Sequence, residues 1–209
     1  MNWQPRSDVE LPESPLAMPQ VIWRALFSRG FSGKKLEELF SPSLQNLTNP
    51  FLMKDMQKAV DRLILAFEKR EKIVIYADFD LDGTSGLALL YEGMRALGYE
   101  NLFYYQPKRL SEGYGLHVAA IEDLSSQGVN VIVTIDVGIT ALDAAKKAKE
   151  VGLDLIITDH HLPYDELPNA FAVVNPNQKN CSSGLGYLCG AGVAFFLLMA
   201  IKKTLGEKG

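Results

Sequence analysis

The strongest constraint on the fold is a change of pattern at residue 72, where short apolar runs begin to alternate with longer helical segments. The apolar runs predict five strands: KIVIYA (72–77), LFYYQ (102–106), VNVIVTI (129–135), LDLIIT (153–158) and FAVVN (171–175). Helical segments follow the first three strands or close the chain, at 84–98, 115–128, 140–152 and 191–206. Near-continuous apolar strands between helices are typical of a parallel sheet covered on both faces. The sequence therefore predicts an α/β fold with a five-stranded, mostly parallel sheet and helices on both faces.

The residues before this alternation are predicted to form a helical lead-in. Prolines at positions 5, 12, 15 and 19 indicate an irregular arm at the start of the chain. Short helical patterns cover 21–30 and 34–40, and apolar residues at three- and four-residue spacing predict an amphipathic helix over 54–70. We therefore expect an N-terminal segment over residues 1–53 and an α/β domain over residues 54–209.

Composition limits the class of protein. No long apolar stretch is free of charge, and the first residues carry acids and prolines where a signal peptide needs an apolar run, so we expect a cytoplasmic protein with no membrane segment. Cys181 and Cys189 are interpreted as plain thiols. The net charge is −4, which argues against a chain that is basic all over. Basic clusters, such as Lys54, Lys58 and Arg62, are interpreted as solvated helix faces, with a local nucleic-acid-binding patch as the alternative.

Acids, histidines and an amide collect where the predicted strands end. They are Asp78, Asp80 and Asp82 after the first strand, Asp136 after VIVTI, Asp159, His160 and His161 after LIIT, and Asn175 after FAVV. The carboxyl ends of parallel strands share one edge of the sheet, and ligands bind there. One aspartate at a strand end is equally well explained as a helix N-cap. Acids at the ends of three strands gather negative charge that requires a compensating cation.

The side-chain types favour Mn²⁺ or Mg²⁺ as that cation. Carboxylate oxygens with one or two imidazoles suit these hard ions, and several carboxylates able to bridge favour two ions over one. Because adjacent residues of a strand point to opposite sides, the alternative that only one of His160 and His161 is functional stays open.

Three of these strand ends carry a family resemblance. YADFDLDG, TIDVGIT and ITDHHLP, in this order, resemble the first three motifs of the DHH phosphoesterase superfamily. RLSEGYGLH, VVNPNQ and LCGAGVAFFLL make the chain similar, within it, to the RecJ family of exonucleases, which degrade single-stranded DNA from 5′ to 3′. The resemblance covers nearly everything after about residue 36. It implies a metal-dependent phosphodiesterase that acts in DNA repair and recombination.

The resemblance also implies roles for the strand-end residues. The implied metal ligands are Asp80, Asp82, Asp136 and His160, with Asp136 bridging two ions and Asp78 serving as a further ligand or supporting acceptor. The implied catalytic residues are His161, close to the scissile phosphate, with Asp159 and Asp136. An aspartate that accepts from an imidazole fixes the tautomer of the ring.

Substrate and partners follow from the same resemblance. Arg109 is the candidate phosphate clamp, because guanidinium binds phosphate bidentately, and an ordinary surface arginine is the alternative. Tyr114 is the candidate base-stacking residue, with Tyr105 as the other choice and packing as the alternative for either, and Asn175 is a further substrate-binding candidate. The implied partners are single-stranded DNA, single-strand-binding protein and repair helicases.

Two features of the RecJ family are missing from the sequence. They are a fourth metal-binding aspartate in a later motif, and a second domain with a glycine-rich, histidine-containing motif. We therefore expect the chain to be the N-terminal domain of a longer protein, and we leave open whether the fragment alone is active.

Other functions fit parts of the pattern. DLDGT matches the haloacid-dehalogenase signature, with Asp80 as nucleophile and Asp82 as acid, but the later strand ends carry DVG and DHH instead of a lysine and an acidic pair. Other DHH phosphoesterases, which hydrolyse pyrophosphate, oligonucleotides or cyclic dinucleotides, are a second alternative. The pyrophosphatases and nanoRNases among them typically carry histidine where this chain has Tyr76. A non-catalytic DHH-type scaffold in a replication or repair complex is the third.

Overall fold

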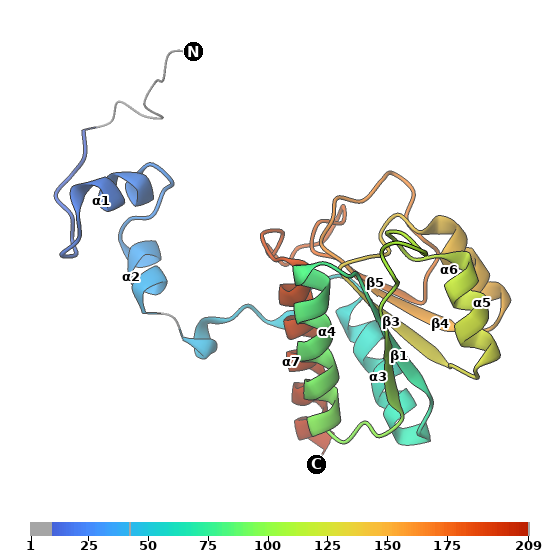
Figure 1. The fold of residues 1–209 in the computed structure, drawn as a ribbon. Helices are drawn as coiled ribbons and strands as arrows, with labels where there is room; N and C mark the ends of the chain where they lie inside the picture. Colours follow the sequence, from blue (N-terminus) through green and yellow to red (C-terminus); the bar gives the residue numbers. More distant parts are fainter. Residues whose placement is uncertain (1–9, 42, 209) are drawn as a thin grey trace. The chain divides into compact units, whose positions relative to one another are not determined.

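The structure is a computed structural model that describes residues 10–41 and 43–208. The chain divides into two compact units, Met1–Leu47 and Thr48–Gly209. The smaller unit contains α1 (Gln20–Phe27), α2 (Lys34–Phe40) and the 3-10 turn η1 (Leu44–Asn46), which confirms the two predicted short helices (Figure 1). The first nine residues of the predicted arm lie outside the described residues.

The larger unit starts at Thr48, and the domain boundary expected at residue 54 stays a prediction. It includes η2 (Pro50–Leu52), which contacts both α3 (Met56–Lys69) and α7 (Gly190–Lys208). Asn49 begins this turn by accepting a hydrogen bond from the Phe51 N–H through its side chain (3.2 Å).

The sheet of the larger unit has five strands: β1 (Ile73–Ala77), β2 (Leu102–Tyr105), β3 (Val131–Ile135), β4 (Asp154–Thr158) and β5 (Ala172–Val174). Their order is β2-β1-β3-β4-β5, and all neighbouring strands are parallel. The prediction of a mostly parallel sheet is therefore confirmed, and the pairing of these five strands is parallel throughout. The chain passes from β1 outward to β2 and then returns to the other side of β1. The connections leaving β1 and β3 therefore diverge, and such a switch point leaves a crevice at the carboxyl edge of the sheet.

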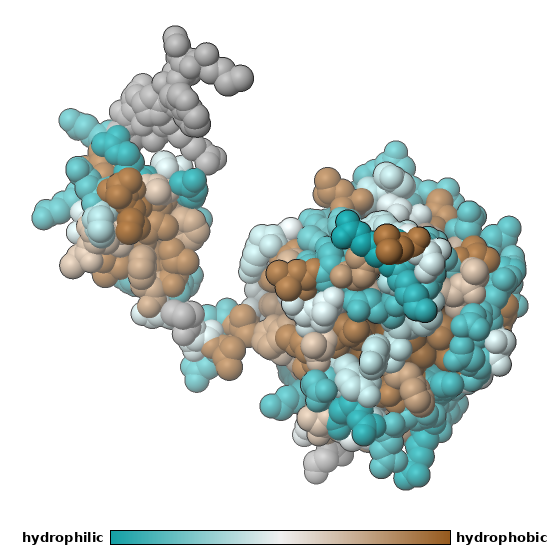
Figure 2. Space-filling model, in the orientation of Figure 1, coloured by the Kyte–Doolittle hydropathy of each residue, from teal (hydrophilic) through white to brown (hydrophobic). Residues whose placement is uncertain are grey.

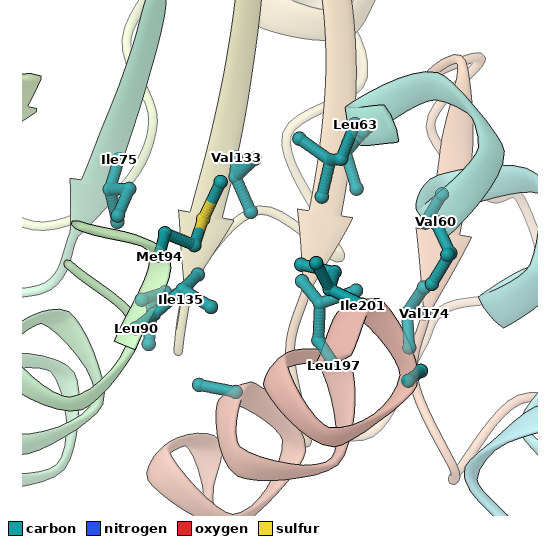
Figure 3. Packing of buried hydrophobic residues seen from close by; sticks show 14 of the residues in the cluster. Val60, Leu63, Ile75, Leu90, Met94, Val133, Ile135, Val174, Leu197 and Ile201 are labelled. Atoms are coloured by element: carbon teal, nitrogen blue, oxygen red, sulfur yellow. The ribbon is translucent and has the colours of Figure 1, made fainter. Parts of the chain in front are cut away.

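Helices cover both faces of the sheet, as the sequence predicted. On one face, α3, α4 (Leu81–Ala96) and α7 bury a continuous apolar cluster against the sheet. Figure 3 shows Leu90 and Met94 of α4, and Leu197 and Ile201 of α7, directed toward the strands. Full burial of such a side chain stabilises a fold by about 1.5–3 kcal/mol. The other face packs against α5 (Val118–Ser126) and α6 (Leu142–Glu150).

The interpretation of Arg62 as part of a solvated helix face is wrong. Its side chain is buried, with Nη2 2.6 Å from Glu71 Oε2 and Nε 2.6 Å from Asp154 Oδ2. The physical reason is its position on the face of α3 that packs on the sheet, where two acids compensate its charge. Arg62 therefore links α3 to the start of β1 and β4.

The visible surface of the larger unit is mostly polar (Figure 2), and the two cysteines are unpaired. Hydrophilic and weakly polar residues cover most of the visible face of the larger unit, with hydrophobic residues scattered among them (Figure 2). Among the described residues, no helix combines the length and the apolar character that crossing a membrane requires. Both cysteines are free thiols, which confirms their interpretation.

Candidate metal centre

The turn from β1 into α4 places three aspartates within five residues. Asp80 is the N-cap of α4, and its Oδ1 accepts from the Gly83 N–H at 2.9 Å. A Cβ at Gly83 would lie 2.4 Å from the Asp78 carbonyl oxygen, so only glycine permits this tight turn. The capping role that one strand-end aspartate could have is thus held by Asp80, and it leaves Asp78 and Asp82 to other partners.

Asp82 bonds to residues far away in the sequence. Its two carboxylate oxygens accept from the N–H groups of Gly190 and Ala191, each at 2.7 Å, at the N-terminus of α7. Burial works to raise the pKa of Asp82, but these two backbone donors outweigh it and hold the pKa below its usual range. Sequence reasoning missed this contact, although its residues lie in the quoted LCGAGV motif.

Asp136 is the central acid of the site. It follows β3 with a left-handed backbone (φ 61°), and its side chain is almost fully buried. Burial, reinforced by the negative charges of Asp82 and Asp80, raises the pKa of Asp136 to about 7. A Cβ at Gly190 would lie 2.6 Å from the Asp136 Cβ, so the start of α7 closes against this acid.

Both histidines reach the acid cluster. His160 Nε2 lies 3.2 Å from Asp136 Oδ1 and 3.5 Å from Asp82 Oδ2, while His161 Nδ1 lies 3.7 Å from the same Asp136 oxygen. The alternation of a strand does not separate them, because the extended segment ends at Thr158. The geometry therefore makes both rings available to the site.

Asp159 holds the two histidines in place. Its buried Oδ1 accepts from the N–H groups of His160 (2.7 Å) and His161 (3.1 Å) and lies 2.7 Å from His161 Nδ1. Its Oδ2 accepts from the Ile139 N–H at 2.9 Å, in the loop after β3. Burial works to lower the pKa of His161, but the bond to Asp159 and the nearby charges of Asp136 and Asp78 raise it above its usual range.

The arrangement fits metal ions. Ligand atoms of Asp136, His160 and His161 lie within 4.8 Å of one another, and so do those of Asp78, Asp80 and Asp136. The buried Oδ1 atoms of Asp78 and Asp136 accept no hydrogen bond from the described residues, although His160 Nε2 lies 3.2 Å from the Asp136 oxygen. Buried carboxylate oxygens without donors are unfavourable unless a cation lies between them. Oxygen ligands with imidazole suit Mn²⁺ or Mg²⁺.

The candidate substrate-binding residues occupy different surroundings. Arg109 is exposed, with its guanidinium 5.5 Å from the ring centroid of Phe79, inside the aspartate turn. Tyr114 is 56% exposed, and burial together with the charge of Asp159 raises its pKa to about 12. Asn175 is fully buried, and its side chain donates to the His161 carbonyl (2.9 Å) and accepts from the Asn177 N–H (2.8 Å).

Tyr76 is not placed as a metal ligand. Its hydroxyl donates to the Gly115 carbonyl at 2.9 Å, and its ring stacks on Tyr105 with centroids 5.3 Å apart. It therefore supports the segment that carries Arg109 and Tyr114.

Comparison with known proteins gives consistent matches. Residues 72–208 match the DHH family, N-terminal domain. The chain is 38% identical over 201 residues to the single-stranded-DNA-specific exonuclease RecJ of Salmonella typhimurium, an alignment that covers 96% of this chain and 34% of that protein.

Solved structures give the same likeness. RecJ from Thermus thermophilus in complex with Mn²⁺ superposes with a TM-score of 0.69 and 29% identity, over 87% of this chain and 25% of that one. An exonuclease RecJ bound to manganese superposes with a TM-score of 0.65 and 33% identity, over 74% of this chain and 39% of that one. The chain thus spans about a third of the length of the RecJ proteins that it matches.

Proposed function

The chain belongs to the DHH family, and from that membership we propose that it is the metal-binding domain of a 5′ to 3′ exonuclease specific for single-stranded DNA, working with two Mn²⁺ or Mg²⁺ ions. The observation that carries the proposal is the pair of buried carboxylate oxygens on Asp78 and Asp136 that accept no hydrogen bond from the described residues, in a cluster with two histidines. We place the activity in the cytoplasm, in DNA repair and recombination, with single-strand-binding protein and repair helicases as partners.

The two groups of ligand atoms support two ion positions. Asp136 belongs to both groups, so it is the residue able to bridge, with His160 on one side and Asp78 and Asp80 on the other. Asp82 completes the set from the first turn of α4, 3.5 Å from His160 Nε2. When bound, the ions would supply charge stabilisation at the phosphate oxygens and lower the pKa of a water molecule.

His161 is suited to contact the scissile phosphate. Asp159 accepts from its Nδ1, which leaves Nε2 free to face the substrate. Because the pKa of the ring is raised, the protonated form has a larger share at neutral pH and can donate to a phosphate oxygen. Nearly half of the side chain is exposed, as such a contact requires.

Arg109 and Tyr114 would hold the rest of the nucleotide. The position of Arg109 over Phe79 keeps its guanidinium beside the turn that carries Asp78 and Asp80, where it can clamp a neighbouring phosphate. The exposed ring of Tyr114 lies in the field of the same acids and offers a stacking surface that does not discriminate between bases.

The test is release of nucleotides from a 5′-phosphorylated single strand by this chain in Mn²⁺, beside the same strand in a duplex. His160→Ala and Asp80→Ala should abolish release, whereas Asp165→Ala, at an exposed acid outside the cluster, should leave it unchanged. Release that survives His160→Ala would refute the proposed site. Mn²⁺ binding without release would mean that these residues hold ions but do not suffice for hydrolysis, and absence of both in a folded chain would favour the scaffold.

A further inference from the structure

We infer that three neutral amide side chains, Gln106, Asn175 and Asn177, are positioning residues that fix the backbone of the metal-binding loops. Each donates to the main-chain carbonyl of a residue in the cluster. The bonds run from Gln106 Nε2 to Asp78 (2.8 Å), from Asn175 Nδ2 to His161 (2.9 Å) and from Asn177 Nδ2 to His160 (2.5 Å). The inference rests on the proposed function in one respect, that the cluster binds divalent cations.

The three bonds connect loops of neighbouring strands. Gln106 follows β2 and reaches the loop after β1, while Asn175 and Asn177 follow β5 and reach the loop after β4. Gln106 Nε2 also lies 2.8 Å from Thr84 Oγ1 in the first turn of α4. The loops that supply the ligands are therefore held by hydrogen bonds from residues that do not belong to the ligand groups.

The consequence is clearest at the two histidines. Their N–H groups donate to Asp159, and their carbonyl oxygens accept from the two asparagines. The backbone N–H and carbonyl groups of both histidines are thus hydrogen-bonded, and their peptide planes cannot rotate freely. The direction in which each imidazole leaves the backbone is therefore set before an ion binds. Such preorganisation is what outer residues supply to metal ligands.

Neutral amides suit this position chemically. The cluster already gathers the carboxylates of Asp78, Asp80, Asp82, Asp136 and Asp159. A carboxylate cannot donate to a carbonyl oxygen, and a lysine or arginine would pair with the acids in place of a metal ion. An amide donates and leaves the charge of the site unchanged.

The surroundings of the asparagines are built to keep them in place. Asn175 is fully buried, and its Oδ1 accepts from the Asn177 N–H, so the two residues form one unit. A Cβ at Gly186 would lie 2.6 Å from Asn177 Oδ1, and the absence of a side chain there leaves room for the amide. Because both polar ends of Asn175 are used inside the fold, positioning accounts for it better than the direct substrate contact expected from the sequence.

The experiment exchanges amides for acids of the same shape. Asn175→Asp, Asn177→Asp and Gln106→Glu each remove the donor, and Asn169→Asp makes the same chemical change at an exposed residue away from the cluster. Extra negative charge by itself would tighten a cation, so weaker binding is the signature of lost positioning. We expect the Mn²⁺ dissociation constant, measured by titration calorimetry, to rise about tenfold or more in the three variants. It should stay within about twofold of the parent value in Asn169→Asp.

Hydrogen exchange on the metal-free proteins gives a second readout. The amides of His160 and His161 should exchange faster in the two asparagine variants, while the core strands keep the protection of the parent. Parent-like Mn²⁺ affinity with parent-like exchange would overturn the inference and leave the proposed function intact. A parent chain that binds no Mn²⁺ would remove the proposed function, and the exchange data would still decide the role of the amides.

A third outcome concerns folding. If the asparagine variants lost their helical circular dichroism in the absence of metal, the residues would be structural and not positioning residues, which also overturns the inference for them. Gln106 is only partly buried, so Gln106→Glu keeps the fold and still tests whether an amide on a ligand carbonyl affects Mn²⁺ affinity.

Discussion

Replacing Asp136 with asparagine should stabilise the metal-free protein at pH 8. The buried carboxylate has a pKa of about 7 in the fold, against about 3.9 in an unfolded chain. The folded state therefore binds more protons than the unfolded state between these values, and stability falls as the pH rises through that window. A shift of about three units corresponds to roughly 4 kcal/mol above pH 7. Neighbouring acids share part of this, so we expect a gain of about 2–4 kcal/mol from the neutral amide.

The assay is thermal unfolding in EDTA at pH 8 and pH 5. For a chain of 209 residues, each kcal/mol shifts Tm by about 2–4 °C, so Asp136→Asn should raise Tm at pH 8 by at least about 4 °C. The gain should shrink at pH 5, because Asp136 is then already protonated in the folded parent. Added Mn²⁺ should reverse the order, since the parent binds the ion and the variant lacks the bridging carboxylate.

Asp165→Asn is the matched control, because the side chain of this acid is 98% exposed and forms a surface ion pair with Lys179. Its stability should stay within about 0.5 kcal/mol of the parent at both pH values. If Asp136→Asn were no more stable than the parent at pH 8 without metal, the idea that an uncompensated charge is buried there would be wrong.

Three further changes test the surroundings of the site. Gly190→Ala should destabilise the fold by about 1–3 kcal/mol and abolish the Mn²⁺-dependent rise in Tm, because its Cβ would meet Asp136 at 2.6 Å. Gly206→Ala, with open space in the same helix, should instead stabilise by about 0.5–1 kcal/mol, and equal effects on Tm would refute the close approach. Asp82→Asn should destabilise the metal-free protein by about 1–3 kcal/mol in urea unfolding at pH 7, since the amide keeps one accepting oxygen and presents its NH2 donor to the other N–H group. A gain like that of Asp136→Asn would contradict this. Arg62→Met should lower the free energy of unfolding, measured in urea, by about 1–3 kcal/mol. This loss is smaller than that for breaking a fully buried ion pair, because one partner acid is partly exposed. An unchanged urea midpoint would show that the ion pairs do not contribute to stability.

Sequence reasoning was most successful where short-range pattern governs structure. The strands, the helices between them and the parallel sheet follow from periodicity and from runs of apolar residues, and the structure confirms them. The gathering of Asp78, Asp136 and His160 was predictable for the same reason, because parallel strands necessarily bring their carboxyl ends to one edge. The same pattern misjudged Arg62, since a basic residue on a helix looks the same in sequence whether it faces solvent or two acids.

The sequence by itself determined the α/β fold, the edge of the sheet at which the site lies and the residue types in it, because each of these depends on neighbours along the chain. Only the tertiary structure decided how those residues are used. Asp82 bonds to N–H groups 108 and 109 residues further along, and Asn175 turns inward to hold His161. The raised pKa of Asp136 likewise arises from burial, with the start of α7 closed against it, and from the acids Asp82 and Asp80 at the start of α4. Such properties depend on which distant segments meet in space, and local pattern carries no record of that.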